Sequence, residues 1–187
     1  MAKILKDRIP VFIAMGVAAV LIGIDRVTKW WIVNNIEYRG SVPGIRFGDF
    51  KLLDITHIHN DGAAFSILSG QQTLLVTVTS IFLVGAIIAV LSGRLRCKWL
   101  FSAVTLIIAG GIGNWIDRIR LGYVLDFVEF QFVNFAVFNI ADVFAVAGAI
   151  LLCIAIIAEE VREYKAKRAC GVGEEVEEVE EESQDEA

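Results

Sequence analysis

Residues 73–91 read TLLVTVTSIFLVGAIIAVL, a run of 19 residues without a charged side chain. About 20 apolar residues in a helix span the hydrocarbon core of a bilayer. Residues 140–158, IADVFAVAGAILLCIAIIA, form a second such run whose only charge is Asp142. In a chain that is 56% hydrophobic, these two runs predict membrane-spanning helices.

Two more apolar stretches have spanning length. Residues 99–116 carry no charge, and residues 10–36 are interrupted only by Asp25, Arg26 and Lys29. We expect residues 10–36 to be retained as a membrane span and not removed as a signal peptide, because no small-residue cleavage site is followed by a soluble mature chain. The sequence therefore predicts an all-α membrane protein with four transmembrane helices.

Basic residues predict the orientation of these helices, because they concentrate on the cytoplasmic side. Ten of them occupy the segment before the first span, the loop between the second and third spans, and the segment after the fourth span. The longer segments 37–70 and 117–139 share five. We therefore expect both termini in the cytoplasm and these two segments at the outer face.

The C-terminal tail differs from the rest of the chain. It holds nine of the 22 acidic residues, so the other 13 are outnumbered by 17 basic residues. A segment with little apolar surface to bury stays disordered. We expect one domain over residues 1–168 and an acidic, disordered cytoplasmic tail over 169–187.

The two outer segments hold most of the unusual polar residues. Residues 37–70 contain glycines, a proline and the alternating run KLLDITHIH, which predict a small β-element. Residues 125–142, LDFVEFQFVNFAVFNIAD, hold five phenylalanines, which suit a membrane interface. We expect them to form a lid or wall. The third span is expected to end near Asn114, and Asn139 to cap the fourth, with Asp142 in its first turn.

Asp126 and Asp142 are candidate catalytic residues. Two carboxylates within hydrogen-bonding reach share a proton, so one can act as a base on water while the other polarises a carbonyl. Two carboxyl groups in these roles are what aspartic peptide hydrolysis requires. The alternative is structural, with Asp142 capping a helix and Asp126 in a loop.

Other polar residues also permit two interpretations. Asp25 and Lys29 are spaced to pair on one helix face, or the first span ends there and Lys29 reaches the interface. Asn60 precedes a turn of small residues and either donates to a substrate carbonyl or belongs to an ordinary turn. Arg118 is expected to pair with Asp117 or another buried aspartate.

We expect neither a metal nor a cofactor, because His57 and His59 have no carboxylate at ligand spacing. Nothing in the sequence indicates a nucleic-acid partner. The alternative function is a small transporter or channel subunit that uses the aspartates as ion ligands. Such a pathway needs polar residues through the second span, which offers only threonines and a serine.

Five motifs, in order, resemble the lipoprotein signal peptidase (signal peptidase II) family over roughly residues 10–160. They are DRVTK at 25–29, HNDGAAFS at 59–66, GGIGNWIDR at 110–118, LDF at 125–127 and FNIAD at 138–142. The resemblance implies four transmembrane helices with a small extracytoplasmic β-cradle between the first two.

It also implies an aspartic endopeptidase of the bacterial cytoplasmic (inner) membrane with its active site at the outer face. Such an enzyme removes signal peptides from diacylglyceryl-modified prolipoproteins, just before the modified cysteine. The implied dyad is Asp126 and Asp142. The implied supporting residues are Asp25, Lys29, Asn60, Gly110, Asn114, Arg118 and Asn139. Membrane lipids as partners, inhibition by the cyclic peptide globomycin and a monomeric state belong to the same expectation.

Overall fold

The computed structural model describes residues 2–63, 67–92, 95 and 97–185, and the side chains of these except residues 2–8, 167 and 169–185. Arg94 and Arg96, which contributed to the predicted orientation, lie outside the described residues. Among the described residues, four helices are long and apolar enough to cross a membrane. They are α1 (Ala2–Asn35), α2 (Gln72–Leu91), α3 (Lys98–Leu121) and α4 (Ile140–Asp185). The predicted fold class is confirmed.

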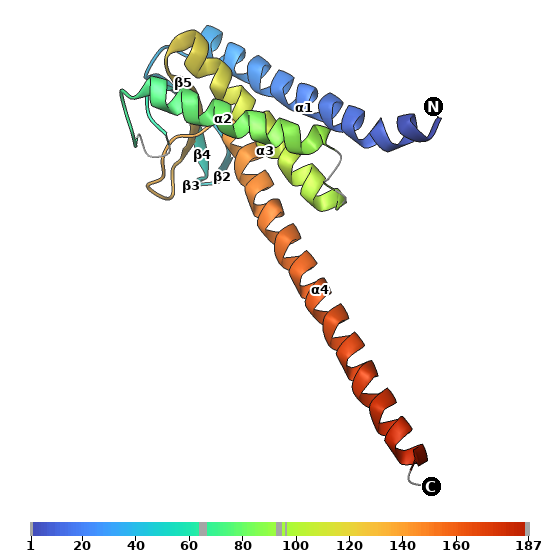
Figure 1. Cartoon of the computed structure of the whole chain (residues 1–187). Helices are drawn as coiled ribbons and strands as arrows, with labels where there is room; N and C mark the ends of the chain where they lie inside the picture. Colours follow the sequence, from blue (N-terminus) through green and yellow to red (C-terminus); the bar gives the residue numbers. More distant parts are fainter. Residues whose placement is uncertain (1, 64–66, 93–94, 96, 186–187) are drawn as a thin grey trace.

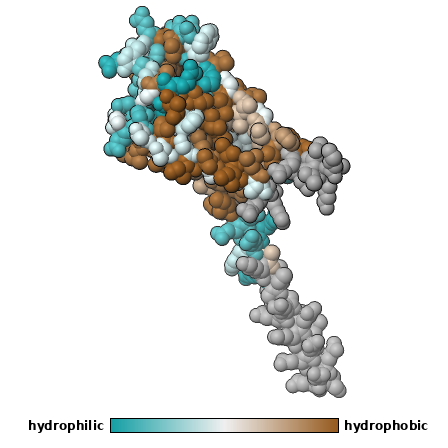
Figure 2. All heavy atoms as spheres, turned by 45° about the horizontal axis from the view of Figure 1, so that its top comes forward, coloured by the Kyte–Doolittle hydropathy of each residue, from teal (hydrophilic) through white to brown (hydrophobic). Residues whose placement is uncertain are grey.

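The apolar surface of the bundle points outward. Figure 2 shows a broad hydrophobic zone between a polar region at one end of the body and polar residues further along α4. In a soluble protein such a patch would be far larger than usual, whereas lipid covers it without cost. Exposed apolar side chains of the helices include Phe12, Val20, Val78, Ile81, Val146 and Ile154.

Two small antiparallel sheets lie together at one end of the bundle, away from the start of α1 and the end of α4 (Figure 1). The strands are β1 (Ser41–Pro43), β2 (Arg46–Phe47), β3 (Phe50–Lys51), β4 (Leu53–Asn60) and β5 (Val124–Phe130). The three-stranded sheet has the order β1-β4-β5, and β2 and β3 form a hairpin. The predicted β-element over 37–70 is present, but the sheet also includes β5, to which sequence analysis gave no strand.

The turn from α3 into β5 places this last strand. Gly122 adopts the left-handed conformation with φ 80°, and its N–H bonds to the carbonyl oxygen of Arg118 at 3.1 Å. Glycine adopts this conformation without the Cβ strain of other residues, so it ends the helix and reverses the chain. The expected end of this span near Asn114 is wrong, because the helix continues to Leu121.

The end of α1 packs against β5. Ile32 and Ile36 form a buried cluster with Leu125 and Phe127. The helix runs past Asp25 to Asn35 without interruption, so it does not end at the charged residues. This packing fixes the distance between α1 and the strand that carries Asp126.

Candidate active site

Asp126 and Asp142 come from different elements and line the same cavity of about 480 Å³. Asp126 lies in β5, opposite Ile58 of β4, and is 2% exposed. Asp142 lies in the first turn of α4, as predicted. The cavity continues along α4 past Val146 and Ile150, so an apolar channel opens beside the two carboxyl groups.

Asn139 connects the two carboxyl groups. Its side chain accepts from the Asp142 N–H and its own N–H donates to Asp142 Oδ2, both at 3.0 Å. This reciprocal pair is a capping box, and it confirms the predicted helix cap. The same side chain donates through Nδ2 to Asp126 Oδ1 at 2.6 Å. One fully buried residue therefore bonds both carboxyl groups, Asp126 through its side-chain amide and Asp142 through its backbone N–H.

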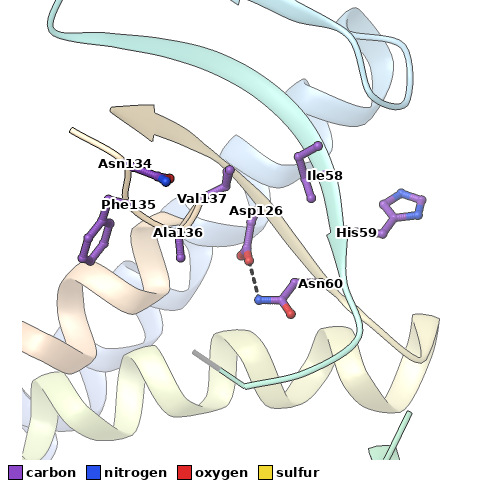
Figure 3. A pocket seen from close by; sticks show the side chains of 8 residues that line it. All are labelled: Ile58, His59, Asn60, Asp126, Asn134, Phe135, Ala136 and Val137. Carbon is purple, nitrogen blue, oxygen red and sulfur yellow. Dashed lines mark hydrogen bonds between the residues drawn. The ribbon is translucent and has the colours of Figure 1, made fainter. Parts of the chain in front are cut away.

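Asn60 holds Asp126 from the other side. Its Nδ2 donates to Asp126 Oδ2 at 2.9 Å, and its Oδ1 accepts from the Gly62 N–H at 3.0 Å. Figure 3 shows both side chains in a second cavity of about 520 Å³, closed on one side by residues 134–137, while His59 points away from Asp126. Because its donor faces the carboxyl group, Asn60 orients Asp126. Its donation to a substrate carbonyl stays a prediction.

Asn114 and Lys29 support Asp142. Asn114 donates to Asp142 Oδ1 at 2.6 Å, and its own oxygen accepts from Lys29 Nζ and from Asn139 Nδ2, each at 3.1 Å. Lys29 also pairs with Asp25 at 3.2 Å, so the predicted pair within the helix is confirmed. The ammonium group fixes which end of the Asn114 amide faces Asp142.

Burial and the neighbouring Asp142 raise the pKa of Asp126 from an ordinary value near 3.8 to about 6. The donors Asn60 and Asn139 and the charge of Lys29 act in the opposite direction. Desolvation disfavours the charged form of a carboxyl group, and a second carboxylate nearby adds repulsion. A carboxyl group that titrates near neutral pH is suited to proton transfer.

The chain is similar in sequence to known proteins. A model of signal peptidase (SPase) II matches residues 17–158. A lipoprotein signal peptidase from Streptococcus agalactiae is 44% identical over 148 residues, which are 77% of this chain and 91% of that relative. One from Streptococcus pneumoniae is 39% identical over 78% of this chain and 92% of the relative. The chain belongs to the signal peptidase II family.

A solved bacterial membrane enzyme supports the same conclusion. It is 32% identical, superimposes with a TM-score of 0.70, and is covered over 88% of its length by 79% of this chain. With four helices of spanning length and bacterial relatives, this signal peptidase II family member is a multi-pass protein of the bacterial inner membrane. Among the described residues, no group of three His, Cys, Asp or Glu side chains could hold a metal ion.

In this family member Arg118 contacts the backbone. Its Nη2 donates to the Gly62 carbonyl at 3.0 Å, and Asp117 pairs instead with Arg26 and Lys29. The predicted ion pair of Arg118 with an aspartate is absent from the described residues. The Arg118 Nε is buried and has no hydrogen-bond acceptor among the described residues, and the Arg118 side chain lines the cavity. A buried donor without an acceptor is suited to a substrate carbonyl.

Gly110 lies outside the cavity. A Cβ built on it would meet the backbone of α4 at the Ala141 carbonyl and, at 2.7 Å, at Ala145 N. Small residues let membrane helices approach closely. This residue therefore brings α3 and α4 together, which places Asn114 beside Asp142.

Sequence reasoning did not identify Arg26 and Asp117 as part of the site. Arg26 was only an interruption of a span, and Asp117 was only a partner for Arg118. Both contribute to a cluster of ion pairs between α1 and α3. A usable indication was that Asp117 follows Asn114 by three residues, which places the two on one helix face.

Proposed function

We propose that this protein is an aspartic endopeptidase that removes the signal peptide from diacylglyceryl-modified prolipoproteins, cleaving just before the modified cysteine. The observation that carries the proposal is the pair of buried Asp126 and half-buried Asp142, joined by Asn139 at the head of an apolar cavity. Membership of the signal peptidase II family supports the substrate class.

The chemistry follows from two carboxyl groups that share a proton. The ionised carboxylate takes a proton from a water molecule, and the resulting hydroxide attacks the carbonyl carbon of the scissile peptide bond. The protonated partner donates to the carbonyl oxygen and stabilises the tetrahedral intermediate. The proton taken from water then passes to the leaving amine. Asn60, Asn114 and Asn139 hold both carboxyl groups in place throughout.

The cavity supplies separate environments for the parts of such a substrate. Its apolar walls from Val143, Val146 and Ile150 of α4 suit acyl chains that enter from the bilayer. Arg118 Nε suits a backbone carbonyl near the scissile bond. The second cavity shares Asp126, Asn60 and residues 135–137 with the first, and it adds His59 and Asn134, so polypeptide beyond the modified cysteine has a partly polar path. We expect both termini in the cytoplasm, the active site at the outer face and a monomer.

The test compares purified wild type, Asp126→Asn and Asp142→Asn on a diacylglyceryl-modified prolipoprotein, with the product followed by its change in size. Wild type is expected to cleave, and each variant to be slower by at least about 100-fold. The unmodified prolipoprotein serves as the control substrate and is expected to remain uncut. Globomycin is expected to inhibit the wild type.

Cleavage that survives in either folded variant would move the catalytic role to Asp25 or Asp117. A folded wild type that leaves the substrate intact would reject the peptidase proposal.

A further inference from the structure

Four charged side chains form a closed cluster beside the carboxyl pair. Asp25, Arg26 and Lys29 come from α1, and Asp117 comes from α3. Each acid contacts both bases: Arg26 pairs with Asp25 and, at 2.5 Å, with Asp117, while Lys29 lies 3.2 Å from Asp25 and 2.7 Å from Asp117. Two acids and two bases make the cluster neutral.

Lys29 connects this cluster to the carboxyl pair through Asn114. Its ammonium group forms ion pairs with Asp25 and Asp117 and donates to the Asn114 oxygen at 3.1 Å. Since the Asn114 oxygen also accepts from Asn139, the Asn114 amide nitrogen is left to face Asp142. The position of Lys29 therefore decides the orientation of the group that bonds Asp142.

Arg26 holds the opposite side of the cluster. Its guanidinium group also donates through Nη2 to the Gly113 carbonyl at 2.8 Å. It therefore touches α3 at Gly113 and Asp117, on both sides of Asn114 in the sequence. Arg26 lines neither cavity at the carboxyl pair, and its side chain is 27% exposed. Any effect on the reaction thus acts through its neighbours.

We propose that Arg26 is a positioning residue for the peptidase reaction, an inference that rests on the proposed function. It keeps the cluster neutral and fixed, so that Lys29 remains directed at Asn114 and Asn114 at Asp142. Removing its charge leaves Asp25 and Asp117 with Lys29 alone, and the cluster then carries one net negative charge next to the dyad.

This excess charge would disfavour ionisation of the dyad. The polar and charged groups around Asp126 come from every neighbouring element: Asn60 of β4, Lys29 of α1, Arg118 of α3, and Asn139 and Asp142 at the start of α4. The charge of Lys29 lowers the pKa of Asp126. With two acids competing for Lys29, the pKa of Asp126 rises further, and both limbs of the pH–activity profile move to higher pH.

The experiment measures kcat and KM of the purified protein on a diacylglyceryl-modified prolipoprotein between about pH 5 and about pH 9. Arg26→Gln removes the charge, and Arg26→Lys keeps it but loses the planar fork. The double variant Arg26→Gln with Asp117→Asn restores neutrality without Arg26.

For Arg26→Gln we expect kcat to fall about three- to tenfold on the acidic limb and to be unchanged or raised on the alkaline limb. KM should stay within about twofold, because Arg26 lines neither cavity. In Arg26→Lys both limbs of the pH–activity profile should stay at the wild-type pH. In the double variant they should lie closer to the wild-type pH than in Arg26→Gln. A residue that only supports folding would lower activity equally at every pH.

A pH–activity profile of Arg26→Gln with both limbs at the wild-type pH would overturn the inference. So would a loss of kcat that is equal at every pH and matches the loss of folded protein. A wild type that does not cleave would reject the proposed function, and the cluster is then tested by the pH dependence of unfolding. Because the folded-state pKa of Asp126 is raised, stability falls as pH rises from near 3.8 to about 6. In Arg26→Gln this window should extend to higher pH, and an identical window would also overturn the inference.

Discussion

Asp126 shows how a single side chain is balanced between two opposing effects. Burial and the neighbouring Asp142 favour its protonated form, while the amide donors Asn60 and Asn139 favour the carboxylate. The outcome, a pKa of about 6, lies where a carboxyl group can exchange protons at neutral pH. Each donor is therefore expected to affect the pH profile as well as the geometry.

Replacing Asn60 with alanine removes a donor that stabilises the Asp126 carboxylate. The pKa of Asp126 should rise, and the acidic limb of kcat against pH should move up by roughly one unit. Asn134→Ala is the matched control, because Asn134 lines the same cavity without a bond to Asp126 in the described hydrogen-bond network. Equal acidic limbs in the two variants would contradict this account of Asp126.

Lys29→Met tests the buried charges. The substitution leaves Asp25 and Asp117 with one cation and the Asn114 oxygen without its ammonium donor. An uncompensated buried charge costs several kcal/mol, so we expect the free energy of unfolding to fall by about 3 kcal/mol. Thermal unfolding in detergent measures it. Lys51→Met, at an exposed position of β3, should change stability by less than about 0.5 kcal/mol. Similar melting temperatures for the two variants would argue against a buried cluster.

Among the elements, α3 organises the site. It contacts α1, α2 and α4, and its last turn leads through Gly122 into β5. Close packing of α3 against α4 at Gly110 brings Asn114 to Asp142. The reciprocal cap of Asn139 and Asp142 then fixes where α4 begins.

Gly110→Ala should separate α3 from α4, because the added Cβ would lie 2.7 Å from Ala145 N. Overpacking of this kind costs about 1–3 kcal/mol, which thermal unfolding in detergent should detect, and activity should fall with it. Gly85→Ala in α2 is the control, since nothing lies within 4 Å of its added Cβ. If Gly110→Ala is as stable as Gly85→Ala, the helices are not held by this contact.

The phenylalanines at the end of β5 and in the segment after it are predicted to form a wall of the substrate site. Phe130 contacts Phe135 and Phe138 with ring centroids 6.1 and 5.2 Å apart, and all three line the cavity. Replacing Phe130 and Phe135 with serine should lower kcat/KM for the lipid-modified substrate by at least roughly tenfold, because each ring buries apolar surface worth about 1.5–3 kcal/mol.

The control for the wall is Phe47→Ser, an exposed residue of β2 away from the cavity, which should cleave like the wild type. Unchanged binding and turnover in the Phe130 and Phe135 variant would remove these rings from the substrate site.

At the scale of the whole molecule, the site lies at one end of an apolar bundle. The sheets and the two carboxyl groups share that end, while α4 continues away from it with polar residues beyond the apolar zone (Figures 1 and 2). Such an arrangement fits chemistry at one membrane surface. The distribution of basic residues in the sequence predicts that this surface is the outer one.

Single cysteines test this orientation in a cysteine-free background. In intact cells, a membrane-impermeant maleimide should label Phe47→Cys at the sheet end and should label Tyr164→Cys on α4 only after permeabilisation. Both side chains are exposed, at 66% each, so accessibility to water and reagent is comparable. The reverse labelling pattern would invert the predicted topology. The boundary between the domain and the tail at residues 168 and 169 stays a prediction.

The sequence by itself determined the features that depend on local composition. Runs of apolar residues specify helices of spanning length, and the spacing of Asp25 and Lys29 within one helix specified their pairing. The order Asn139–Ile140–Ala141–Asp142 ahead of an apolar run specified a cap. Each of these depends on neighbours within about four residues, so a linear pattern is enough.

Only the tertiary structure decided which groups meet across elements. The register of β4 against β5 places Asn60 beside Asp126, and the pairing of Asp117 with Arg26 and Lys29 replaces the expected pairing with Arg118. Sequence analysis did not predict strand β5, because its segment is largely buried and lacks the alternation of apolar and polar residues that marks a half-exposed strand. Contacts between residues far apart in the chain depend on the packing of helices and strands, which no local pattern records.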